Sequence, residues 1–160
     1  MNAVEKISLI FSSLGEAVAS LGDPAHAPSA DAVSFLERQQ LGHLLPGEYR
    51  DFLLGFGSAE IREEQFYSIF VPFGEVRGAT DIHFRYKTSI ELGELTSRHV
   101  PFFSSSYIGV GLYYFECEAA ASGRLSGESV YRFLNDENDK IADSFSEFLI
   151  WYIKRNGLIG

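Results

Sequence analysis

Carboxylates are the residues of this chain whose types and spacing could do chemistry. Two groups stand out, Glu116 with Glu118, and Asp136 with Glu137 and Asp139, which Asp143 follows closely. Glu63 and Glu64 form a further pair. Paired carboxylates can act as a general acid and a general base, and clusters of them can bind cations. The second group lacks the spacing of an EF-hand loop, and nothing in the sequence places an acid and a base around one pocket. We therefore interpret the second group as a solvated turn.

The other residues that could do chemistry are scattered along the chain. The four histidines are His26, His43, His83 and His99. None of them lies three or four residues from another or from Cys117, so the sequence shows no metal-ligand spacing. Cys117 lies in an apolar stretch and is expected to be a small core residue rather than a nucleophile. Because a dinucleotide fingerprint and a nucleophile elbow are also missing, we expect no cofactor and no catalysis.

Composition bounds the class of protein. The chain has 160 residues, of which 46% are hydrophobic, and this is enough for one well-buried core in one domain. A net charge of −9 argues against binding to nucleic acid or to anionic membranes, and favours either a basic partner or simple solubility. A single cysteine fits a reducing compartment, and no apolar run reaches transmembrane length. We expect a cytoplasmic protein.

The first part of the chain is predicted to be helical. Apolar residues at spacings of three and four predict a helix from Val4 to Leu21. A second helix is expected to begin near Asp31, with Ser29 or Asp31 as its cap. Pro46 then begins a third helix. Its apolar face is predicted to consist of Tyr49, Phe52, Leu53 and Phe56.

Strand patterns predominate further on. The predicted strands are 59–61, 66–71, 82–87, 100–103, 108–117 and 129–134. A short helix is expected after the Thr88–Glu91 capping box, a loop over 119–127 and a polar acidic turn over 135–140. A second capping box, Ser144–Glu147, predicts a final helix with Phe145 and Phe148 on its buried face. This succession predicts an α+β fold, a single domain whose mainly antiparallel central sheet is flanked by N-terminal helices and a C-terminal helix.

Two motifs in this layout resemble the SUKH superfamily, which includes cell-wall-assembly regulators of the Smi/Knr type and many bacterial immunity proteins. The first runs from Phe35-Leu-Glu37 to the Leu45-Pro46-Gly-Glu-Tyr49-Arg-Asp-Phe52-Leu53 helix start. The second is the closing Ser144-Phe-Ser-Glu-Phe148-Leu149 segment. The likeness covers about residues 30–155. It implies a helical extension and loop over 1–28 and a SUKH-like domain over 29–157, both within one structural domain.

The resemblance also implies a function without catalysis. Bacterial members of the superfamily are similar to antitoxins that bind and neutralise a cognate toxin, often a nuclease, inside the producing cell. The alternative is a regulatory protein-binding module without a toxin partner. A third hypothesis, from another class, is a small hydrolase whose site assembles only in space. A carboxylate-rich surface suits a basic toxin because it can mimic phosphate. The candidate partner-binding residues are Glu116, Glu118, Asp136, Glu137, Asp139, Tyr107 and Tyr113. The apolar stripe of the first helix is also a candidate homodimer surface.

Overall fold

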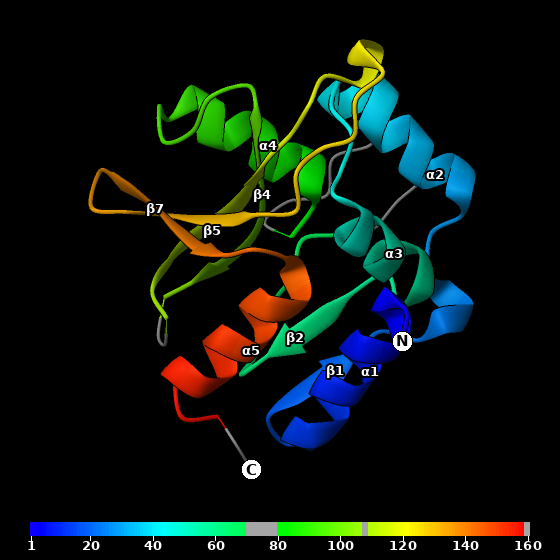
Figure 1. Ribbon diagram of the computed structural model, residues 1–160, viewed down its shortest axis with the longest axis vertical. Helices are drawn as coiled ribbons and strands as arrows, with labels where there is room; N and C mark the ends of the chain where they lie inside the picture. Colours follow the sequence, from blue (N-terminus) through cyan, green and yellow to red (C-terminus); the bar gives the residue numbers. More distant parts are fainter. Residues whose placement is uncertain (70–79, 107–108, 159–160) are drawn as a thin grey trace.

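Helices and two antiparallel sheets make up the fold. The computed structural model describes residues 1–69, 80–106 and 109–158 (Figure 1). The first sheet has the order β1-β2-β3, with β1 (Ala19–Leu21), β2 (Ala59–Ile61) and β3 (Glu64–Gln65). The second has the order β4-β5-β6-β7, with β4 (His99–Ser105), β5 (Gly111–Glu116), β6 (Val130–Leu134) and β7 (Glu137–Ala142). The predicted α+β fold is confirmed, with its strands divided between two sheets.

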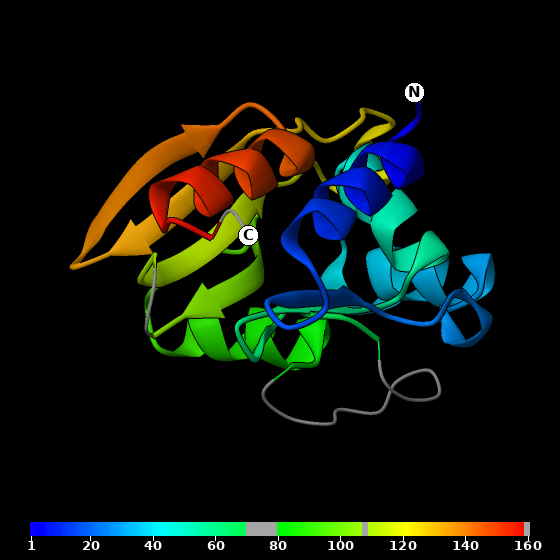
Figure 2. The ribbon, with the colours of Figure 1, turned by 90° about the horizontal axis from the view of Figure 1, so that it is seen from below.

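Helices cover both faces of the four-stranded sheet. The α-helices are α1 (Ala3–Leu14), α2 (Ala30–Phe35), α3 (Gly47–Gly55), α4 (Ile82–Glu91) and α5 (Phe145–Arg155). A π-helical segment, Leu36–Leu41, continues α2, and short 3₁₀ turns occupy Pro24–His26 and Ala120–Ser122. Figure 2 shows α5 on one face of the sheet and α4 on the other. No helix in the described ranges is long and apolar enough to cross a bilayer.

Side-chain caps explain where several helices begin. The predicted caps Ser29 and Ser144 are confirmed, since each side chain accepts a hydrogen bond from a backbone N–H of the first turn. Asn2 and Asp81 cap α1 and α4 in the same way. Pro46 immediately precedes α3 as expected, because its missing N–H costs nothing at that position.

Aromatic rings fill the core between α3, α5 and the four-stranded sheet. Tyr49 is fully buried, and its ring centroid lies 5.0 Å from that of Phe145 and 5.3 Å from that of Phe115. The register of β4 on β5 shifts between Pro101 and Phe103, as in a β-bulge. Phe102 therefore stacks on Phe115 at 4.4 Å while Phe103 also contacts the core.

Three predictions need correction where the structure has helices α1 and α4. The first helix ends at Leu14 instead of Leu21, because Gly15 adopts φ +78° and ψ 153° and turns the chain into β1. The segment 82–87 is helix α4 and not a strand. Its buried residues, Ile82, Tyr86 and Ser89, follow helical spacing, and the apparent alternation misled the prediction. The capping box at Thr88–Glu91 accordingly lies at the end of α4 and starts no helix.

Four of the other predicted strands are confirmed, and two further segments differ from the prediction. Strands were found over 59–61, 99–105, 111–116 and 130–134, in agreement with the predictions. Of the predicted strand 66–71, residues 66–69 form only an isolated bridge at Ser68, and the remainder lies outside the described residues. The acidic turn is shorter than predicted. Only Asn135 and Asp136 form it, both with positive φ as in a type I′ hairpin, and β7 begins at Glu137.

The aromatic core yields a stability prediction. We expect Phe145→Ala to lower the free energy of unfolding by about 3–5 kcal/mol, because the ring is fully buried among other rings. Ile150→Ala on the same helix is the matched control. Its side chain is 42% exposed, so the change should be within about 0.5 kcal/mol. Urea denaturation measures both, and equal effects would contradict this description of the core.

Candidate functional site

The first group of candidate carboxylates lies where β5 ends. Arg98 reaches Glu116 at 3.7 Å and Glu118 at 3.8 Å. Arg124 reaches the other oxygen of Glu118 at 3.2 Å. These carboxylates therefore already have cationic partners from the chain itself, and a basic partner protein would have to compete with them.

The second group lies on the β6–β7 hairpin. Asp136 is in the turn, Glu137 and Asp139 are on β7, and all three side chains are exposed. Within the described ranges, no cation lies within 4.0 Å of any of them. Their charges are thus available to solvent, and the hydrogen-bonded hairpin holds them in a fixed arrangement.

The sheet register separates the two groups. In the β5–β6 pair, Phe115 is opposite Val130 and Leu112 is opposite Phe133. The end of β5 that carries Glu116 therefore lies beside the start of β6, while the hairpin turn lies beyond the other end of the pair. The five carboxylates cannot act as one cluster.

The two aromatic candidates differ in outcome. Tyr107 lies outside the described residues. Tyr113 was expected to be an exposed anchor, and this is wrong, because it is fully buried and its hydroxyl donates to the carbonyl of Gly109. Its position on β5 directs the ring toward α5, where the centroid lies 4.8 Å from that of Phe148. Burial raises the pKa of Tyr113 to about 12, against an opposing effect of Arg132.

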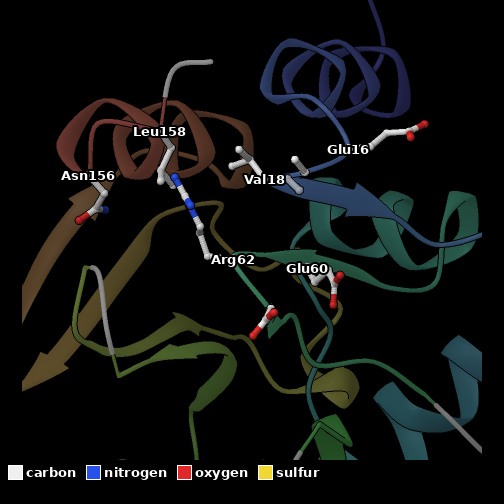
Figure 3. A pocket seen from close by; sticks show the side chains of 9 residues that line it. Glu16, Val18, Glu60, Arg62, Asn156 and Leu158 are labelled. Carbon is white, nitrogen blue, oxygen red and sulfur yellow. The ribbon is translucent and has the colours of Figure 1, made fainter.

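A hollow of about 550 Å³ lies between the β2–β3 turn, the start of β1 and the end of α5 (Figure 3). Arg62 points into it toward Leu158, whereas Glu16 points away. The lining residues are Glu16, Ala17, Val18, Ala19, Glu60, Arg62, Glu63, Asn156 and Leu158. Among the described residues, no hydrogen bond or ion pair joins two of these side chains. The hollow is lined by the cationic side chain of Arg62 and by carboxylates, but not by a nucleophile paired with a base.

The histidines and the cysteine do not form a reactive centre in the part of the chain that the structure describes. Cys117 is fully buried, as predicted, and burial raises the pKa of its thiol to about 12. Burial lowers the pKa of both His83 and His99. Over the described ranges, no three side chains of the His, Cys, Asp and Glu types are grouped so that they could hold a metal ion.

Three carboxylates that were not candidates for chemistry or partner binding hold the helices in place. Glu37 is 3% exposed, accepts a hydrogen bond from the Leu45 N–H at 2.8 Å and pairs with Arg50 at 3.1 Å. Glu128 accepts hydrogen bonds from the first N–H groups of α3, and Glu48 of α3 does the same for Ser146 of α5. The hydrogen bonds of Glu128 and Glu48 join residues that are 80 or more positions apart, and no local sequence signal reveals them.

Comparison with known protein families identifies a family for this chain. Residues 28–151 match the family model described as SMI1 / KNR4 family (SUKH-1). The matched range includes Glu37, Pro46 and Tyr49 of the first motif and Ser144 and Phe148 of the second. No curated protein matches the chain.

The burial of Cys117 yields a second prediction. A thiol reacts with Ellman's reagent as its thiolate, so burial and a raised pKa should both slow the reaction at pH 8. We expect the folded protein to react slower than the protein in strong denaturant by a factor on the order of 100. The release of the coloured thiolate measures both rates. Similar rates would show that Cys117 is accessible in the folded state.

Proposed function

Because the chain belongs to the SMI1/KNR4 family (SUKH-1), we propose that it is a non-catalytic immunity protein that binds and neutralises a cognate bacterial toxin. The family is consistent with immunity proteins and with regulatory protein-binding modules, and both act by binding another protein. The net charge of −9 favours a basic partner.

The observation that carries the proposal is the acidic β6–β7 hairpin. Asp136, Glu137 and Asp139 are exposed, and no described cation lies within 4.0 Å of them. Carboxylates in such an arrangement attract a basic surface at long range and can occupy the positions that phosphates take in a nuclease cleft. A basic nuclease is therefore the class of toxin that we propose.

Binding, not chemistry, is the mechanism that we propose for neutralisation. The protein would cover the toxin's basic cleft and exclude its nucleic-acid substrate by steric and electrostatic competition. Because the toxin is made in the producing cell, the protein would act in the cytoplasm of that cell. No step of this mechanism requires a cofactor or a metal ion.

The test is protection of cells that carry the toxin. The gene beside the one for this chain is expressed alone and together with it, and surviving colonies are counted. Killing by the neighbouring gene alone, prevented by this chain and accompanied by a stoichiometric complex, would support immunity. If no neighbouring product is toxic, or if purified protein retrieves housekeeping proteins instead, the regulatory module becomes the better interpretation.

Charge reversal on the hairpin should weaken protection. We expect the double substitution Glu137→Lys with Asp139→Lys to slow association with the toxin by about tenfold, because electrostatic steering acts mainly on the association rate. Surface plasmon resonance at two salt concentrations measures the rate, and the difference between variant and wild type should shrink at high salt.

The matched control changes the net charge by the same amount at other exposed positions. Asp51 on α3 and Glu91 on α4 are exposed and serve for this purpose. The substitutions Asp51→Lys and Glu91→Lys together should have much less effect on association. An equal effect of both pairs would show that net charge matters and that the hairpin has no special role.

A further inference from the structure

Strand β7 forms a free edge of the four-stranded sheet. The strand order is β4-β5-β6-β7, and β7 pairs only with β6 among the described residues. Glu137 to Lys140 are exposed, and Figure 1 shows the hairpin extending from the body of the protein. An edge strand presents backbone N–H and C=O groups that another strand can pair with.

The hairpin geometry indicates which backbone groups point outward. In a hairpin with a two-residue turn, the residues flanking the turn form a hydrogen-bonded pair, here Leu134 and Glu137. Hydrogen-bonded and non-hydrogen-bonded pairs then alternate along the ladder. Asn138 opposite Phe133 and Lys140 opposite Tyr131 are thus non-hydrogen-bonded pairs. The N–H and C=O groups of Asn138 and Lys140 point away from β6, toward the open edge.

A hollow lined by both charged and apolar side chains adjoins this edge where β7 meets α5. Its volume is about 330 Å³. The lining residues are Lys140, Ile141, Ala142, Asp143, Glu147 and Trp151. Trp151 and Ile141 are partly buried and pack against the core. A tryptophan at the side of a hollow is a typical anchor for a partner side chain.

The charge of this edge selects the occupant. Between residues 136 and 143 the chain carries the carboxylates Asp136, Glu137, Asp139 and Asp143 and a single cation, Lys140. Lys140 is itself 2.6 Å from Asp143. A second copy of this chain would bring like charges together across a β7–β7 pair, which is unfavourable. A basic segment would instead be attracted.

We propose that β7 receives an extended basic segment of another protein as an additional strand of the sheet, with an apolar side chain of that segment in the hollow beside Trp151. This inference rests on the proposed function for its partner, because the toxin would supply the segment. Strand addition at β7 specifies how the protein would bind the toxin. Backbone hydrogen bonds to Asn138 and Lys140 supply affinity, and the acidic side chains select for lysine and arginine.

The test uses a short peptide in which lysine alternates with valine, acetylated and amidated at its ends, as the probe. Trp151 is the only tryptophan of the chain, so its fluorescence reports binding at this edge without a label. Both Lys140→Pro and Lys140→Ala remove the positive charge of the side chain. Only Lys140→Pro also removes the backbone N–H that points outward. We expect Lys140→Pro to bind about tenfold more weakly than Lys140→Ala, as for one lost hydrogen bond.

A second measurement does not depend on the variant's folding. Hydrogen exchange by NMR on the wild-type protein should show that the Lys140 and Asn138 amides become protected when the peptide is added. Equal affinities of two folded variants, no binding of the peptide, or unprotected amides would overturn the proposal. Concentration-dependent dimerisation that Lys140→Pro abolishes would also overturn it, in favour of a second copy at this edge.

These outcomes are separate from those of the proposed function. If the wild-type chain and Lys140→Pro protect cells equally well against the toxin, immunity stands and strand addition at β7 fails. If no toxin exists but the peptide pairs with β7, the edge is a docking site for a different basic partner and the immunity proposal fails.

Discussion

The burial of Tyr49 is the constraint on which the rest of the structure depends. A hydroxyl without solvent contact needs a hydrogen-bond acceptor, and Tyr49 donates to the carbonyl of Tyr67 at 2.5 Å. Tyr67 in turn donates its N–H to the carbonyl of Phe102 on β4. Tyr49 of α3 is thus linked, through the backbone of Tyr67, to β4 of the four-stranded sheet. Desolvation raises the pKa of Tyr49 well above its usual value, so the hydroxyl stays a donor.

This arrangement determines which parts of the sheet remain open. Phe145 packs against Tyr49 and holds α5 over one face, while α4 covers the other (Figure 2). The opposite edge of this sheet, strand β4, is not open in the same way, because the N–H of Tyr67 donates a hydrogen bond to Phe102 of β4. Strand β7 remains at the open edge, where its acidic side chains are exposed. An acidic edge strand of this kind is suited to recognition, because its backbone is already extended for pairing with another strand.

Local signals in the sequence predicted much of the fold. The caps Ser29 and Ser144 and the buried face of α3 depend on residues within one or two helical turns, and the sequence shows these directly. Segment 82–87 was mistaken because apolar residues at alternate positions also fit a helix face, and the cap Asp81 precedes the pattern. Contacts between distant residues, such as Glu128 with α3 and Glu48 with α5, have no local signal. Tyr113 was misplaced for a similar reason, because β5 is buried on both faces, and this follows only from the packing of helices on both sides of the sheet.

The measurement that tests the account most directly is hydrogen–deuterium exchange of the chain alone and in complex with the neighbouring gene's toxic product. The account predicts that exchange slows over the β6–β7 hairpin and the start of α5, and that amides near the hollow at Arg62 are unchanged. Protection confined to the Glu37–Arg50 region or to the 119–127 loop, with an unchanged hairpin, would contradict it. The partner would then bind at a surface other than the acidic edge.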